Sequence, residues 1–194
     1  LKGSAGVDTI TGGAGGDAIT GGAGADALSG GAGDDTFNYA VLTDLFVVST
    51  GNDLVDASIA GGDGSDSIVI TVDADNGIAL DDADPFADVT SVETLKTSGK
   101  SDEVISIDLD ASAYTAGIVT VDVSSDTDVA GANVIKLDEM GGGITVIGGA
   151  GVETITGSGS VDTIRGGDGN DVIDGGAGAD VLIFEASAAA NGAD

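Results

Sequence analysis

The sequence predicts an all-β fold, a right-handed parallel β-roll in which short strands stack in successive coils. Three observations lead to this prediction. Nine-residue units that begin with glycines recur at both ends of the chain. The 194 residues include 35 Gly but only 1 Pro, which argues against a disordered Pro/Gly tract. Hydrophobic residues make up 41% of the chain but aromatic residues only 3%, so aliphatic side chains must fill thin layers rather than a thick core.

The repeated nonapeptide has the pattern G-G-x-G-x-D-x-U-x, where U is a large apolar residue. Residues 3–38 hold four consecutive units, and residues 148–183 hold four more, including one with Glu153 at the sixth position and a degenerate one with Ser160 in place of glycine. The register continues through Asp44 and Asp53. After a four-residue insertion, a further full unit spans residues 61–69.

Each unit predicts a tight turn followed by a three-residue strand. The glycines permit positive φ and a close backbone approach, and the middle residue of the strand points inward. Two nonapeptide units therefore form one coil, and stacked coils give two parallel sheets. The inward residues are expected to be Ile10, Ile19, Leu28, Phe37, Phe46, Val55, Ile155, Ile164, Ile173 and Leu182.

Stacking also brings together sixth-position acids that lie two units apart in the sequence. Two carboxylates about 4 Å apart repel by roughly 4 kcal/mol at an effective dielectric of ~20. Because the turns also direct carbonyl oxygens into the same space, a cation that takes six to eight oxygens fits, and Ca²⁺ suits this better than Mg²⁺. Asp66 ends its run of units and is expected to have no matching acid in the next coil, so no site is expected there. The expected pairs are Asp8/Asp26, Asp17/Asp35, Asp26/Asp44, Asp35/Asp53, Glu153/Asp171 and Asp162/Asp180.

The composition excludes several functions. With 34 acidic against 5 basic residues, the formal charge is −29, and the chain has no basic patch for nucleic acid or for anionic lipid. Without His or Cys it lacks the usual zinc ligands, the usual general base and a thiol nucleophile. The sequence contains no apolar run of about 18 residues, so it does not predict membrane insertion. We therefore expect a protein that is not an enzyme.

The units resemble the RTX (repeats-in-toxin) calcium-binding nonapeptide family over about half of the chain. The resemblance implies that each ion is coordinated by two turns in successive coils. One turn supplies the main-chain carbonyls of nonapeptide positions two and four and its acid. The turn above supplies the carbonyls of positions one and three and its acid. Asp44 and Asp53 are further candidate ligands, although residues 39–47 lack the turn glycines. The implied ligand sets are Ser4, Gly6 and Asp8 with Gly21, Ala23 and Asp26; Gly13, Gly15 and Asp17 with Gly30, Ala32 and Asp35; Gly149, Gly151 and Glu153 with Gly166, Asp168 and Asp171; and Ser158, Ser160 and Asp162 with Gly175, Ala177 and Asp180.

The middle of the chain lacks the glycine signature and shows short runs of alternating apolar and polar residues, which predict half-buried strands. We expect an irregular β-solenoid with wider coils, without a regular calcium ladder and without a helix. This gives three parts: an N-terminal β-roll at 1–69, the irregular solenoid at 70–147 and a C-terminal β-roll at 148–194. Asp81, Asp82 and Asp84 before Pro85 form a candidate loop site for an isolated calcium ion.

Ordering many glycines costs entropy, so the repeats are expected to fold only with calcium. The RTX resemblance implies type I secretion from bacteria and an extracellular or cell-surface location. We expect a secreted calcium-binding structural module of a bacterial surface protein resembling an S-layer protein. Alternatives are a carrier segment of a type I-secreted enzyme or toxin, and an adhesin or ice-binding module. Besides several calcium ions, candidate partners are copies of the chain itself and cell-surface polysaccharide. Since both termini lie in repeat-like sequence, we expect the chain to be part of a longer protein.

Overall fold

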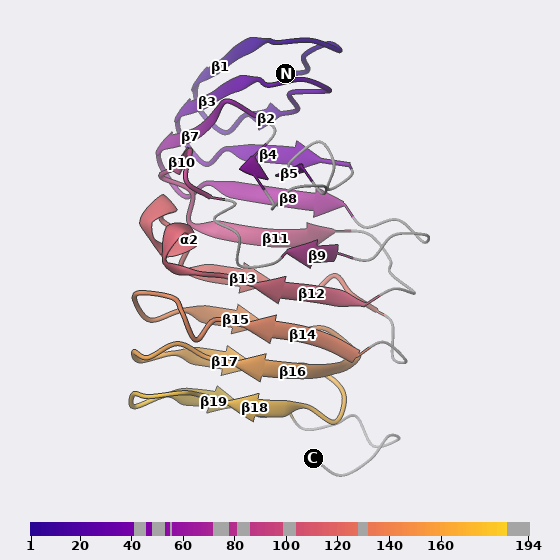
Figure 1. The fold of residues 1–194 in the computed structure, drawn as a ribbon, viewed down its shortest axis with the longest axis vertical. Coiled ribbons are helices and arrows are strands. Elements are labelled where there is room, and N and C mark those ends of the chain that lie inside the picture. Colours follow the sequence, from indigo (N-terminus) through magenta and orange to yellow (C-terminus); the bar gives the residue numbers. More distant parts are fainter. Residues whose placement is uncertain are drawn as a thin grey trace.

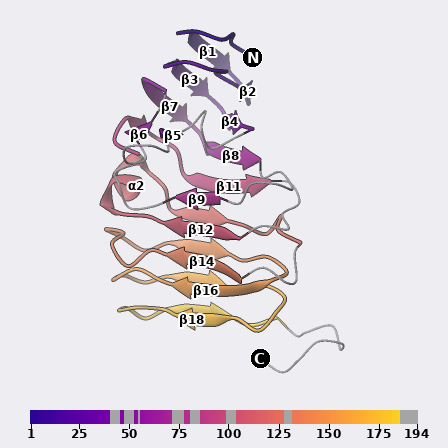
Figure 2. The same cartoon turned by 45° about the vertical axis from the view of Figure 1, so that its right-hand side comes forward.

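The computed structural model describes residues 1–40, 46–47, 53–54, 56–71, 78–80, 86–98, 104–127 and 132–185. The chain forms an elongated stack of coils that starts with β1 at one end and finishes with β18 and β19 at the other (Figure 1). Turning the stack shows the strands of successive coils lying beside one another as rungs (Figure 2). The predicted fold class, a parallel β-roll solenoid, is confirmed.

In the described part of the chain, three parallel sheets run along the stack. A four-stranded sheet contains β1 (Thr9–Ala14), β3 (Ala27–Ala32), β7 (Ser58–Asp63) and β10 (Val89–Thr90). A five-stranded sheet contains β9 (Ile78–Leu80), β12 (Ile105–Asp108), β14 (Ala132–Lys136), β16 (Val152–Thr156) and β18 (Val172–Asp174). An eight-stranded sheet contains β2 (Ala18–Ile19), β4 (Thr36–Tyr39), β8 (Ser67–Thr71), β11 (Thr94–Ser98), β13 (Thr120–Asp122), β15 (Thr145–Ile147), β17 (Thr163–Arg165) and β19 (Val181–Ile183). The short strands β5 (Phe46–Val47) and β6 (Asp53–Leu54) pair antiparallel.

The length of a coil changes along the stack. Thr9 pairs with Ala27, which is the predicted step of two nonapeptides, and Thr145 pairs with Thr163 at the same step. Between these ends the steps are longer: Ala27 pairs with Ser58, and Ser67 pairs with Thr94. The first of these steps is long because the chain between β4 and β7 includes the β5–β6 pair. The second is long because β8, β9 and β10 follow one another in three different sheets, so that coil has three sides instead of two. The proposed division at residues 69/70 and 147/148 stays a prediction, and the eight-stranded sheet crosses both positions.

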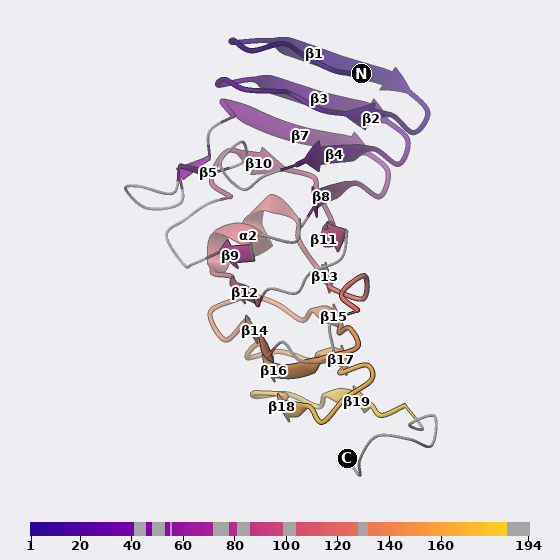
Figure 3. The same cartoon turned by 90° about the vertical axis from the view of Figure 1, so that its right-hand side faces the viewer.

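A short helix, α2 (Ala111–Ala116), occupies the third side of one coil, so the prediction that the middle has no helix was wrong. Asp110 caps its N-terminus by accepting a hydrogen bond from Ser112 N at 2.8 Å, and Gly117 ends it with φ 112°. Val92 N donates to Ala116 O at 3.2 Å, which joins α2 to the coil of β10. Figures 1 and 3, which label both elements, place α2 on the β10 side of the stack. The helix is too short to show a helical period, but its two caps were visible in the sequence.

The core is a narrow column of aliphatic and aromatic side chains with a member from each strand of a sheet, and several strands bury a second side chain, as β8 does with Ile70. On the eight-stranded sheet the column contains no polar residue, and its members pair in register from coil to coil. Leu182 in β19 pairs with Ile164 but is 36% exposed, because β19 is the last described strand of this sheet. The side chains of the predicted core residues Phe46 and Val55 lie outside the described residues. The buried members on this sheet are Ile19, Phe37, Ile68, Leu95, Val121, Val146 and Ile164.

Replacing one large member of this column should destabilise the whole stack. Phe37 is fully buried between Ile19 and Ile68, so Phe37→Ala should lower the free energy of unfolding by about 3–5 kcal/mol. Urea unfolding in excess calcium measures this loss. Val161→Ala, at a position 61% exposed, is the control and should change stability by no more than about 0.5 kcal/mol. Equal effects of the two substitutions would contradict the assignment of the core.

Candidate calcium sites between the coils

Acidic residues stand in columns at the edges of the stack, directly before the strands. On the eight-stranded sheet the residues that precede the paired strands form one such column. Its acids fall into two groups, separated by the apolar residues Val119 and Ile144. In chain order the column is Asp17, Asp35, Asp66, Glu93, Val119, Ile144, Asp162 and Asp180.

Neighbouring acids in a column are joined by a repeated hydrogen bond. Asp8 N donates to Asp26 Oδ1, and Asp17 N donates to Asp35 Oδ1, both at 2.8 Å. At the far end, Glu153 N donates to Asp171 Oδ1 and Asp162 N donates to Asp180 Oδ1, both at 3.0 Å. The structure therefore brings together four of the pairs expected from the two-unit step. Each bond occupies one carboxylate oxygen and leaves the other for a different partner.

The other two expected pairs are wrong. Asp26 N donates to Asp56 Oδ1 at 3.1 Å rather than to Asp44, and Asp35 N donates to Asp66 Oδ1 at 2.7 Å rather than to Asp53. The physical reason is that β3 and β4 pair with β7 and β8, where the glycine turns resume after a longer stretch of chain. The side chains of Asp44 and Asp53 lie outside the described residues, as does the candidate loop site at residues 81–85.

Asp66 also has a neighbour that the sequence did not reveal, so the expectation of no matching acid was wrong. Its N–H donates to Glu93 Oε2 at 2.7 Å. The coil between Asp66 and Glu93 has three sides and is longer than two nonapeptides, so a search at the two-unit step passed over Glu93. The available signal was the apolar alternation after Glu93, which marks the next strand of the same sheet.

Several carboxylates in these columns have an oxygen that nothing in the protein satisfies. Among the described residues, the buried side-chain oxygens without a hydrogen-bond partner are Asp26 Oδ2, Asp35 Oδ2, Asp66 Oδ2 and Glu153 Oε2. All four residues are at most 1% exposed. A buried ionised carboxylate without a partner is costly, so each of these oxygens requires a cation or a proton.

The turn glycines bring further oxygens to the same place. A Cβ at Gly12 would lie 2.6 Å from Asp17 Oδ2 and would also contact Gly30 O in the next coil. A Cβ at Gly157 would lie 2.6 Å from Asp162 Oδ2 and 2.5 Å from Gly175 O. The second oxygen of the acid and the first-position carbonyl of the next coil thus converge beside a glycine. Any side chain there would fill the space that they share.

The carboxylate and carbonyl oxygens between the coils are suitable ligands for calcium. Among the described residues, no three His, Cys, Asp or Glu side chains gather into a cluster. A site between coils therefore combines two carboxylates with main-chain carbonyls, an all-oxygen set that suits a hard cation rather than zinc. The binding by the individual predicted ligands stays a prediction, and the geometry supports it at the four adjacent pairs.

The amide side chain of Asn133 takes the place next to Glu153 in the acid column of the five-stranded sheet. Asn133 Nδ2 donates to Asp126 Oδ2 at 2.7 Å and to Glu153 Oε1 at 3.1 Å, while Asn133 Oδ1 accepts from Ile105 N at 2.9 Å. The three side chains are buried together. The amide protons therefore lie between two carboxylates. Sequence analysis missed Asn133 and Asp126 because neither belongs to the nonapeptide pattern.

Burial shifts the titration of two of these acids. The pKa of Glu153 is raised to about 7, chiefly by burial and also by the neighbouring Asp171 carboxylate, which together outweigh the lowering by the hydrogen bond from Asn133. Burial also raises the pKa of Asp66, with the Asp35 and Glu93 carboxylates adding to the shift. Protons and calcium therefore compete for the same oxygens.

In chelator, acidification should favour the folded form. The folded state keeps the Glu153 proton up to about pH 7, whereas the unfolded chain releases it near 4.5. The folded state binds more protons between these values, so the free energy of unfolding falls as pH rises through this window and is regained as pH falls. The β signal in circular dichroism should therefore increase from pH 7.5 to pH 5. Glu153→Gln should weaken this dependence and Glu139→Gln should not; a β signal that decreases on acidification would contradict the prediction.

A comparison with protein families agrees with this geometry. Residues 2–37 and 147–182 match the family model described as RTX calcium-binding nonapeptide repeat (4 copies). Neither the curated proteins nor the solved structures gave a match. The matched segments contain the four adjacent acid pairs with their glycine turns. The two end segments of the chain are therefore similar to RTX calcium-binding nonapeptide repeats.

Proposed function

We propose that the chain is a secreted structural module that folds when calcium binds between its coils. The observation that carries this proposal is the set of buried, unpartnered oxygens on Asp26, Asp35, Asp66 and Glu153. In this proposal each ion neutralises facing carboxylates and fixes the glycine turns around it.

The energetic argument is one of linkage. A net charge of −29 opposes a compact state, and the glycine turns lose backbone entropy on ordering. An ion that binds only the folded turns adds its binding free energy to folding. Extracellular calcium modules bind at roughly 10⁻⁴ to 10⁻³ M, far above cytosolic calcium, so the chain stays unfolded until it leaves the cell.

A role at the bacterial surface follows from the same features. RTX repeats occur in secreted bacterial proteins, and no helix in the described residues has the length and apolar character needed to cross a membrane. The chain has no His and no Cys for catalysis, so we propose a structural rather than enzymatic role. Its composition of small residues, few basic residues and no Cys supports an S-layer-like protein as the parent.

The ice-binding alternative has little structural support. A flat array of threonines would have to persist from coil to coil on an outer face. Instead Thr9 pairs with Ala27, and Thr11 pairs with Ser29 and then with Ala60 through β3. These changes break the array at Thr9 and Thr11 after a single coil. On the eight-stranded sheet Thr94, Thr120, Thr145 and Thr163 do pair in register, but the next outward positions are Lys96, Asp122, Ile147 and Arg165. That column is one threonine wide and lacks the paired threonines of a flat array.

Calcium titration tests the proposed function. Protein freed of metal at neutral pH should give the circular dichroism of an unfolded chain, and the β signal should appear cooperatively at roughly 10⁻⁴ to 10⁻³ M calcium. Magnesium at the same concentration should not replace calcium, because it demands a stricter octahedron. Identical β spectra in chelator, magnesium and calcium would contradict the proposal.

Asp35 offers a matched substitution, because it borders two gaps of its column and its neighbour Asp34 is exposed. Asp35→Asn should raise the calcium concentration at the midpoint of folding about tenfold, equivalent to about 1.4 kcal/mol. Asp34→Asn changes the charge equally and should leave the midpoint within about twofold, a shift of under about 0.5 kcal/mol. Equal shifts in the two variants would indicate an effect of net charge alone.

A further inference from the structure

The glycine turn at residues 61–66 stacks on a turn that has no nonapeptide sequence. Its coil neighbour is Ser91-Val92-Glu93, which lies between β10 and β11. Asp66 N donates to Glu93 Oε2 at 2.7 Å, and Glu93 N donates to Asp66 O at 3.1 Å. These two bonds hold the Glu93 carboxylate directly beside Asp66. Neither turn falls within the segments that match the RTX repeat.

The main-chain carbonyl of Ser91 occupies the place that the carbonyl of a first-position glycine occupies in the repeats. A Cβ at Gly61 would contact both Asp66 Oδ2 and Ser91 O, as a Cβ at Gly12 would contact Asp17 Oδ2 and Gly30 O. Ser91 has φ 51°, and among the described residues it is the one non-glycine residue with a positive φ. This left-handed conformation is unusual for serine, and it lies where the chain directs a carbonyl toward Asp66.

The oxygen at the centre of this arrangement has no partner in the protein. Asp66 is fully buried, and its Oδ2 makes no hydrogen bond while Oδ1 accepts from Asp35 N. Basic side chains of the described strands are engaged elsewhere: Lys96 Nζ donates to Asp122 at 2.7 Å, Lys136 pairs with Asp108, and Arg165 pairs with Glu185. The described side chains therefore supply no cation to the gap between Asp66 and Glu93.

We propose that this gap is a further calcium site, held by the carboxylates of Asp66 and Glu93 and by the carbonyl of Ser91. The site extends the calcium ladder one coil beyond the nonapeptides, into the three-sided part of the stack. It ends the ladder there, because Val119 and Ile144 take the next places in the column. The proposal rests on the proposed function, since it assigns one more ion to the same kind of gap.

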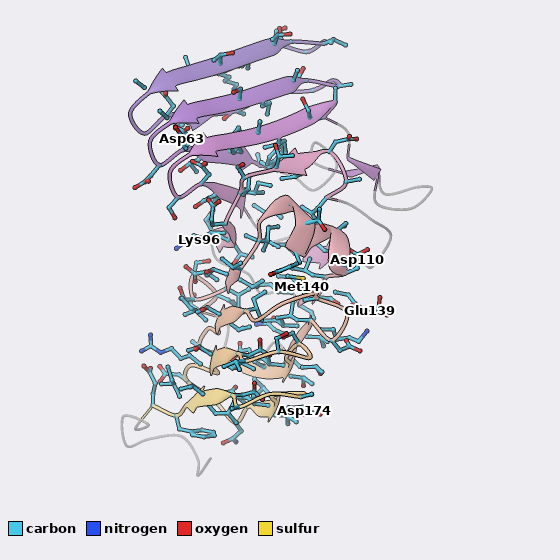
Figure 4. All side chains as sticks on the ribbon, turned by 90° about the vertical axis from the view of Figure 1, so that its left-hand side faces the viewer. Asp63, Lys96, Asp110, Glu139, Met140 and Asp174 are labelled. Atoms are coloured by element: carbon cyan, nitrogen blue, oxygen red, sulfur yellow. The ribbon has the colours of Figure 1, made fainter. Side chains whose placement is uncertain are left out.

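Glu93→Gln tests the site with little effect on the other gaps. Gln keeps an oxygen to accept from Asp66 N, so it removes the charge and leaves the hydrogen bond. Calcium bound per full-length chain, measured by equilibrium dialysis at saturation, should fall by one ion relative to the unmodified protein. Glu139→Gln is the matched control and should leave the number of bound calcium ions unchanged. Glu139 is exposed and lies at the opposite edge of the stack from Asp63, which belongs to the 61–66 turn (Figure 4). An unchanged number in Glu93→Gln, with a β spectrum intact, would overturn the site.

A crystal of the unmodified chain in calcium decides the matter if Glu93→Gln fails to fold. An anomalous difference peak bonded to Asp66 Oδ2 and Ser91 O supports the site. Peaks between Asp8 and Asp26 and between Asp17 and Asp35, but none beside Ser91, would overturn it and leave the proposed function standing. The absence of peaks throughout the stack would count against both.

Discussion

Facing carboxylates between successive coils are the constraint on which this structure depends. The hydrogen bond from one acid's N–H to the next acid's carboxylate sets the register of the stack, and it also forces negative charges together. In Asp26, Asp35, Asp66 and Glu153 one carboxylate oxygen accepts a hydrogen bond within the protein and the other, which is buried, has no partner. The fold therefore creates a need for cations at its edges, and the glycine turns provide the space and the carbonyls that meet it.

The middle of the stack is stabilised differently from its ends. Its three-sided coils enclose more apolar side chains, such as Phe86, Leu109 and Met140, together with α2. There the acid columns are closed by polar or apolar groups: Asn133 donates to Glu153, and Val119 and Ile144 take the places after Glu93. In the middle, a wider core supplies the stability that we propose calcium supplies at the ends, and the eight-stranded sheet runs through both parts.

The sequence predicted the parts of the fold that repeat at a constant step. The two-unit spacing identified the strands around Ile10, Ile19 and Leu28 and the neighbours of Asp8 and Asp17. It failed at Asp26, Asp35 and Asp66, whose neighbours lie further along the chain than two nonapeptides. The steps from Asp26 and Asp35 are lengthened by the chain between β4 and β7, and the step from Asp66 by β9 and β10. Which strands stack on one another across such stretches is a long-range property that a local pattern does not contain. The same limit hid Glu93 and Asn133, since each acquires its role only through stacking.

Small-angle X-ray scattering with and without calcium tests the central claim most directly, because it measures the radius of gyration of the chain. The claim is that repulsion between facing carboxylates keeps the coils from stacking until ions bind. An unfolded chain of this length has a radius of gyration of roughly 47 Å. The account predicts a value near this in chelator at neutral pH, and a collapse to less than about half of it when calcium is added. The same compact radius in both solutions would contradict it.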